Sequence, residues 1–82
     1  MNWTVYILEC ADGSLYTGIT TDLSRRITEH ETGKGARYTI GRSPFRLVYQ
    51  EFRINRSDAT KRETAIKTMT RAEKLALISR KP

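Results

Sequence analysis

Two short runs of mostly apolar, strand-forming residues open the chain and predict a β-hairpin. The first covers about residues 3–10 and the second about residues 15–20, and both are rich in β-branched and aromatic residues. Between them stands Ala11-Asp12-Gly13, and an Asp-Gly pair flanked by such runs is a strong hairpin signal. The pattern therefore predicts two antiparallel strands joined by a tight turn.

The length of that turn decides which side chains share a face of the hairpin. A two-residue turn at Asp12-Gly13 places Tyr6 and Tyr16 on opposite faces. A three-residue turn, with Gly13 in the left-handed conformation, pairs Tyr6 with Gly18 and places both tyrosines on one face. We favour the three-residue turn, because it gathers apolar residues on the opposite face: Val5, Ile7, Leu15 and Ile19.

The next segment has the spacing of a helix. An N-cap at Thr21-Asp22 and a stop at Gly33 predict a helix over about residues 22–32. At about 100° per residue, Arg26 lies on the inward side of this helix, near His30. An arginine and a histidine are thus expected to face the rest of the fold.

A loop and a third strand are predicted next. Glycine and proline mark residues 33–44 as a loop, and a loop of this length suggests a functional role. A strand is expected over residues 45–52, in which Leu47 and Tyr49 share a face and Val48 interrupts the alternation.

Two helices are predicted to end the chain. Ser57 or Asp58 is expected to cap the first, which ends near Met69. Its apolar face consists of Ala59, Ile66 and Met69. A capping box, Thr70-Arg71-Ala72-Glu73, begins a third, short helix. The inward residues of that helix are expected to be Leu75, Ala76 and Ile78.

These elements predict an α/β fold in the order β-β-α-β-α-α, with a small three-stranded, mostly antiparallel sheet flanked by helices. The 82 residues are 38% hydrophobic and 29% charged, which is typical of a single small globular domain over residues 1–82. The sequence has no apolar run of the roughly 18–20 residues that a membrane span needs. One cysteine, Cys10, and one histidine, His30, exclude an internal disulfide and a Cys/His zinc site. We therefore expect a reduced, cytoplasmic protein and a monomer.

The net charge of +6 is unevenly distributed. Residues 1–52 carry six basic and six acidic residues, whereas residues 53–82 carry nine basic and three acidic ones. Such asymmetry favours a polyanionic partner, nucleic acid, although a charge of this size also serves solubility. In the predicted loop, basic side chains interleaved with a tyrosine suit contacts with phosphate and base: Lys34, Arg37, Tyr38 and Arg42.

Five polar side chains stand where apolar ones are expected: Tyr6, Tyr16, Arg26, His30 and Glu63. Each has a structural explanation, such as packing of a tyrosine ring, a histidine at a helix end, or a pair between Glu63 and Lys67. A carboxylate in an apolar stripe nevertheless needs a partner or a metal ion. Together these groups suit phosphodiester cleavage, in which a carboxylate holds Mg²⁺, an arginine stabilises phosphoryl charge and a tyrosine relays a proton.

The motifs also resemble those of a known family. Val5-Tyr6-Ile7, followed by Tyr16-Thr17-Gly18, is similar to the paired signature of the GIY-YIG nucleases. Arg26 matches the arginine that the family carries on its helix, and His30 matches a position where family members have His or Tyr. Glu63, in the stretch RETAIK, matches the family's metal-binding glutamate. The resemblance covers essentially the whole chain. It extends to the small single-domain bacterial branch, whose members share stretches like HETGKGARYT and RSPFRLVYQE.

The resemblance implies a divalent-metal-dependent endonuclease that hydrolyses phosphodiester bonds in DNA, including branched or damaged DNA in repair or recombination. By this resemblance, Glu63 holds one Mg²⁺ or Mn²⁺ ion. Tyr6 acts as general base on the attacking water, assisted by Tyr16 or His30, and Arg26 steadies the phosphate or the leaving group.

Two further residues complete the contacts that the resemblance implies. Gly18 allows the substrate backbone or the Tyr6 ring to approach closely, and Lys67 adds a phosphate contact.

The alternative to the nuclease is a non-catalytic nucleic-acid-binding module with the same fold. Two features favour that alternative: Ile19 stands where some nucleases have a lysine, and no asparagine follows Glu63.

Overall fold

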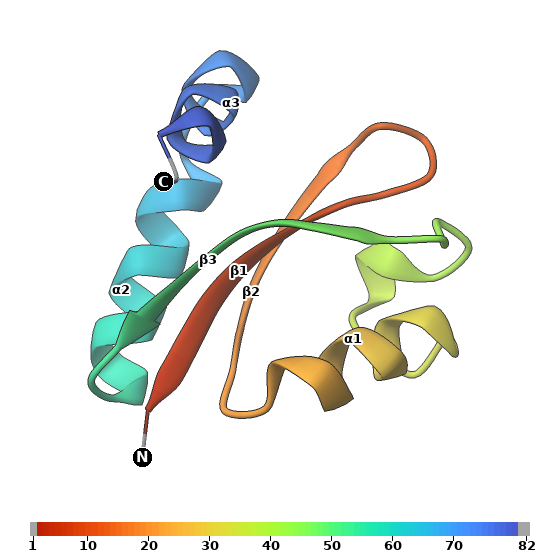
Figure 1. Ribbon diagram of the computed structural model, residues 1–82, viewed down its shortest axis with the longest axis horizontal. Helices are drawn as coiled ribbons and strands as arrows, with labels where there is room; N and C mark the ends of the chain where they lie inside the picture. Colours follow the sequence, from red (N-terminus) through yellow and green to blue (C-terminus); the bar gives the residue numbers. More distant parts are fainter. Residues whose placement is uncertain (1, 81–82) are drawn as a thin grey trace.

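Three antiparallel strands and three helices follow one another in the predicted order β-β-α-β-α-α, which confirms the expected fold class. The structure is a computed structural model that describes residues 2–80. Its elements are β1 (Trp3–Glu9), β2 (Leu15–Thr20), α1 (Leu23–Glu31), a 3₁₀ turn η1 (Arg37–Thr39), β3 (Arg46–Arg53), α2 (Arg56–Lys67) and α3 (Arg71–Ser79). The strand order is β2-β1-β3, so the first strand is central and β2 is an edge strand (Figure 1).

The hairpin has the register of the three-residue turn. The Cys10 N–H donates to the Ser14 carbonyl over 2.8 Å, and Gly13 has a φ of +83°. In this register Tyr6 lies opposite Gly18. The prediction that both tyrosines share a face is therefore confirmed, because a two-residue turn would have shifted every pair by one residue.

The two faces of the sheet pack against different helices and bear different side chains. One face bears the hydrophobic core against α2, with Val5 and Ile7 of the central strand packed on Ala59 and Ile66. The other face bears Tyr6, which points toward α1 and hydrogen-bonds there. Figure 1 shows α2 and α1 on opposite sides of the sheet. The fully buried Leu8 lies on the same face as Tyr6, so that face combines apolar packing with the polar side chains.

A bulge in β3 interrupts the side-chain alternation that was expected for that strand. Tyr49 lies opposite Ile7 but Leu47 lies opposite Leu8, so the register shifts between them. The extra residue, Val48, packs against the core together with Tyr49, and Leu47 turns to the opposite face. The prediction that Leu47 and Tyr49 share a face is therefore wrong.

The start of α2 also differs from the expectation. Asn55 is the N-cap: its side-chain oxygen accepts from the Asp58 N–H over 2.8 Å, and its backbone is extended. Ser57 and Asp58, the predicted caps, lie within the first turn of the helix. All three residue types are good caps, and the point where β3 ends decides which one is used.

The start of α3 is as predicted, whereas its buried side is not. Thr70 and Glu73 form both hydrogen bonds of the capping box. Leu77 and Ile78 pack against the core, but Leu75 is 43% exposed. The direction in which α3 leaves α2 selects its buried face, and helical spacing alone does not specify that direction.

Candidate active site

The Tyr6 hydroxyl lies at the centre of a polar cluster on the α1 face of the sheet. Tyr6 is fully buried, and its Oη lies 2.8 Å from Nε2 of His30. A Cβ atom at Gly18 would lie 2.6 Å from this Oη, so only glycine leaves room for the ring. The predicted space beside Tyr6 is confirmed.

The neighbours of His30 define which of its nitrogens carries the proton. Its Nδ1 lies 2.9 Å from Oγ1 of Thr39, and that hydroxyl donates its own proton to the Ala36 carbonyl over 2.7 Å. The Thr39 oxygen therefore accepts from Nδ1–H, which leaves Nε2 to accept from the Tyr6 hydroxyl. His30 is 1% exposed, and this burial, with the nearby Arg26 charge, lowers its pKa. His30 is thus a neutral acceptor at pH 7.

The segment predicted as a loop covers His30. Its middle forms η1, which carries the buried Thr39. Gly35 passes so close to His30 that a Cβ atom there would lie 2.3 Å from Nδ1. Sequence reasoning missed Thr39, because neither its spacing nor its surroundings in the sequence distinguish it from other threonines.

Tyr16 extends the cluster toward solvent. Its ring centroid lies 5.2 Å from that of His30 and 5.9 Å from that of Tyr38, which is stacked on it. The Arg42 guanidinium lies 4.3 Å from the centroid of the Tyr38 ring, donates to the Tyr38 carbonyl and forms an ion pair with Asp12. Tyr38 and Arg42 therefore have internal partners, and their role as nucleic-acid contacts stays a prediction.

Arg26 and Glu63 approach Tyr6 from different elements. Arg26, on α1, is half-buried and donates to Glu29 over 3.0 Å; its charge lowers the pKa of Tyr6. Glu63, on α2, has a side chain that is only 19% exposed and pairs with Lys67 Nζ at 3.2 Å. Its negative charge opposes ionisation of Tyr6 and adds slightly to the raised pKa of that hydroxyl.

The ionisation of Tyr6 is strongly disfavoured in the protein alone. Burial raises its pKa to about 12, the neighbouring Tyr16 adds to this rise, and Arg26 opposes it. Tyr6 is consequently protonated at neutral pH and donates its hydrogen bond to His30. Any role as a base requires an additional positive charge or a coupled proton transfer.

The residues present fit one metal ion with a single protein ligand. Among residues 2–80, no three His, Cys, Asp or Glu side chains come together as a metal cluster. Glu63 offers one carboxylate of hard oxygen atoms, and Mg²⁺ is commonly held by one carboxylate, water and substrate phosphate. A metal held in this way would replace the contact between Glu63 and Lys67.

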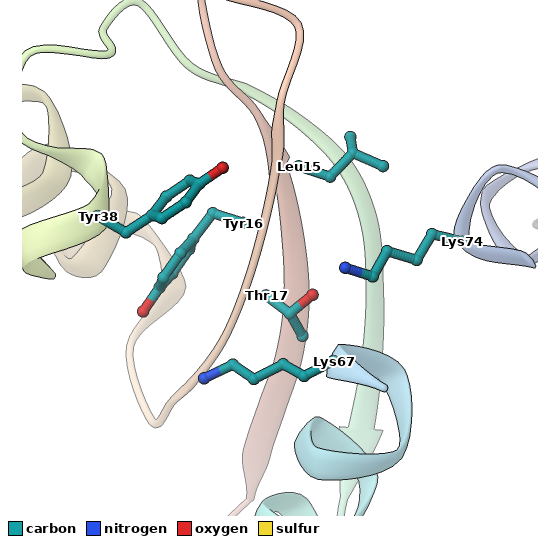
Figure 2. A pocket seen from close by; sticks show the side chains of 6 residues that line it. All are labelled: Leu15, Tyr16, Thr17, Tyr38, Lys67 and Lys74. Carbon is teal, nitrogen blue, oxygen red and sulfur yellow. The ribbon is translucent and has the colours of Figure 1, made fainter. Parts of the chain in front are cut away.

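The remaining predicted nucleic-acid contacts lie at the surface. Lys34, Arg37 and Lys67 are exposed. Lys67 also lines a cavity of about 340 Å³ that crosses the edge of β2, together with residues from three other elements (Figure 2). Its lining residues are Leu15, Tyr16, Thr17, Tyr38, Lys67 and Lys74. Two of them, Thr17 and Lys74, were not anticipated from the sequence.

Residues 2–76 match the family model for the GIY-YIG catalytic domain. The chain belongs to the GIY-YIG family. The GIY-YIG domain is that of a nuclease family whose members typically depend on a divalent metal ion. Within residues 2–80, no helix has the length and apolar character required to cross a membrane.

Several relatives and two solved structures are similar to this chain over nearly its whole length. The UPF0213 protein of Desulfotalea psychrophila is 57% identical over 93% of this chain and 70% of its own. That of Clostridium perfringens is 56% identical over 99% and 86%. The solution structure of a UPF0213 protein from Bacillus halodurans, 52% identical, matches 96% of this chain and 84% of its own with a TM-score of 0.63. A solution structure of an E. faecalis protein, 41% identical, has the same coverage and a TM-score of 0.68.

Proposed function

We propose that this GIY-YIG domain is a metal-dependent endonuclease that hydrolyses phosphodiester bonds in DNA, including branched or damaged DNA. The observation that carries the proposal is the hydrogen bond from the buried Tyr6 hydroxyl to neutral His30, with Arg26 beside it. A tyrosine bonded to a proton acceptor and facing a guanidinium suits proton removal from a water molecule.

In the proposed reaction the attacking water loses a proton to Tyr6 as Tyr6 transfers its own proton to Nε2 of His30. The hydroxide forms the new P–O bond, the ester P–O bond breaks, and the leaving oxygen takes a proton from solvent. Thr39 accepts from Nδ1–H throughout and keeps Nε2 free. Tyr6 stays neutral in this relay, and Arg26 stabilises the negative charge that develops on the phosphate oxygens.

The difference in pKa between donor and acceptor explains why such a reaction needs a cation. The pKa of Tyr6 is raised to about 12 by burial, and burial lowers the pKa of His30, so proton transfer from Tyr6 to His30 is unfavourable in the free protein. A bound divalent ion supplies positive charge that stabilises hydroxide and phosphate oxygens. Glu63 is the residue that would hold it.

A second candidate is a nucleic-acid-binding module without catalysis. Tyr6 is fully buried, which favours a structural role for its hydroxyl. The hydrogen bond to His30 would then join β1 to α1, and the basic residues would carry the function.

Cleavage of labelled DNA separates the two candidates. The domain is incubated with linear, nicked and forked substrates in Mg²⁺ or Mn²⁺, beside Glu63→Gln and Arg26→Gln variants. We expect metal-dependent cleavage that falls by at least about 10²-fold in each variant, because each loses a group that stabilises transition-state charge.

The control is Glu31→Gln, an exposed carboxylate at the end of α1, which should cleave like the wild type. Binding without cleavage under all metal conditions, unchanged in Glu63→Gln, would contradict the nuclease and support the binding module.

A further inference from the structure

We propose that the cavity across the edge of β2 is a subsite for the sugar-phosphate backbone of a nucleic-acid strand, next to the phosphate that is cleaved. The inference rests on the proposed function, because the cavity shares Tyr16 and Lys67 with the candidate active site. Thr17 and Lys74 are its additional binding residues. It therefore defines the path of the strand on the protein.

The position of β2 at the sheet edge creates two walls. Because side chains alternate along a strand, Tyr16 points to the α1 face and Thr17 to the α2 face. Figure 2 shows Tyr16 beside Tyr38 on one side of β2, and Thr17 between the strand and the two lysines on the other. The cavity of about 340 Å³ is within the size range of small-ligand sites.

The hydroxyl of Thr17 has no role within the protein that the structure reveals. Thr17 is 3% exposed, and its Oγ1 is enclosed without a hydrogen-bond partner among residues 2–80. Figure 2 shows this oxygen on the side of the residue that faces Lys74. Most buried hydroxyls have a hydrogen-bond partner, so an unpartnered one in a cavity wall is available to bind a ligand oxygen.

The two lysines give the cavity a positive charge. Lys67 extends from α2 past Thr17 toward Tyr16, and Lys74 points from α3 toward β2 (Figure 2). Lys67 is paired with Glu63, whereas Lys74 forms no ion pair within the described part of the chain. An ammonium without a carboxylate partner beside an unpartnered hydroxyl suits a phosphate group.

The aromatic wall favours contact with backbone rather than with a base. Tyr16 is stacked on Tyr38, and Arg42 lies over the Tyr38 ring, so ring faces are already occupied. Ring edges and hydroxyls remain to contact a sugar or a phosphate. Recognition at this subsite is thus expected to be independent of base sequence.

The test measures binding of a fluorescent single-stranded oligonucleotide of eight nucleotides to the full chain in EDTA, where cleavage does not occur. We expect Thr17→Val to weaken binding about tenfold while the melting temperature stays the same or rises, because the hydroxyl has no internal partner to lose. Lys74→Gln should weaken binding by a similar factor at low salt. Lys61→Gln, an exposed lysine of α2 outside the cavity, is the charge-matched control and should change affinity by less than about twofold.

Three results would each overturn the subsite. The first is wild-type affinity in Thr17→Val, and the second is a loss in Lys74→Gln no larger than that in Lys61→Gln. The third is a marked fall in the melting temperature of Thr17→Val, which would assign the hydroxyl to the fold. The outcome is separate from the nuclease proposal: binding lost in these variants without any cleavage by the wild type keeps the subsite and rejects the nuclease. Cleavage by the wild type, together with unchanged binding in the variants, keeps the nuclease and rejects the subsite.

Discussion

At the scale of single residues, His30 connects three elements and defines the chemistry of the cluster. Its Nε2 accepts from Tyr6 on β1, its Nδ1 donates to Thr39 on η1, and its backbone belongs to α1. Both ring nitrogens are occupied, and a protonated ring would place an Nε2–H donor against the donating Tyr6 hydroxyl and an added charge near Arg26. The cluster is therefore built for a neutral histidine.

The lowered pKa of His30 predicts a pH-dependent stability. In the unfolded chain the histidine titrates near 6.5, and in the folded protein below that value. Below about pH 6.5 the unfolded state binds a proton that the folded state does not, so stability is complete above this pH and is lost as pH falls. We expect the free energy of unfolding to decrease between about pH 7 and 5.5, by at most about 1.4 kcal/mol per pH unit.

Urea unfolding at several pH values checks this expectation, with His30→Gln as the comparison. Since His30 is the only histidine, the variant should lose the pH dependence in this range. Parallel curves for the two proteins would show that another group is responsible.

At the scale of elements, the cap of α2 determines where the helix that carries Glu63 begins. Asn55 holds the first turn through the Asp58 N–H, whereas Ser57 lies exposed within that turn. Glu63 lies four residues after Ala59 and three before Ile66, so the packing of these two buried residues sets the side of the helix on which Glu63 lies. The cap thus stabilises the helix that carries Glu63, whereas the core packing orients that helix.

Substitution of the two potential caps separates their contributions. Asn55→Ala should lower the free energy of unfolding by about 1 kcal/mol, because an N-terminal N–H of the helix loses its acceptor. Ser57→Ala, the matched control, should change it by less than about 0.5 kcal/mol. Denaturant titration measures both, and equal losses in the two variants would contradict the assignment of Asn55.

At the scale of the whole molecule, the main apolar cluster and the candidate active site lie on opposite faces of the sheet. The buried apolar cluster lies between the sheet and α2, with Ile66 fully enclosed in it. The opposite face carries the polar cluster beside the buried Leu8, and Tyr16 is only partly buried there. A domain of this size has a total stability near the low end of about 5–15 kcal/mol, so it tolerates few losses from the core.

This separation predicts different effects on the two faces. Ile66→Ala should lower the free energy of unfolding by about 2–5 kcal/mol, through lost burial and a cavity. Tyr16→Phe keeps the ring contacts and should change stability by less than about 0.5 kcal/mol, although it removes a hydroxyl from the candidate site. Thermal unfolding followed by circular dichroism measures both, and a larger loss in Tyr16→Phe would contradict this division.

Local patterns in the sequence were sufficient for much of the fold. The strand runs and the Asp-Gly turn predicted the hairpin and its register, because the glycine that adopts φ > 0 lies in the turn itself. The capping box predicted the start of α3 for the same reason: its two partners are three residues apart. The bulge at Val48 and the cap at Asn55 escaped prediction, because each depends on what lies across the sheet or before the helix.

Some residues of the candidate site could likewise be predicted from local patterns, whereas others could not. Tyr6, Tyr16, Arg26 and His30 could be placed on one side from alternation and helical spacing, and the structure brings these side chains together. The sequence by itself thus determined the hairpin, the helices and the polar residues that face inward, since these depend on neighbours within one or two turns of chain. Only the tertiary structure decided that Thr39 orients His30, that Arg42 packs on Tyr38, and that Thr17 and Lys74 share a cavity. Those contacts join segments far apart in the chain, and their geometry follows from how the helices pack on the sheet.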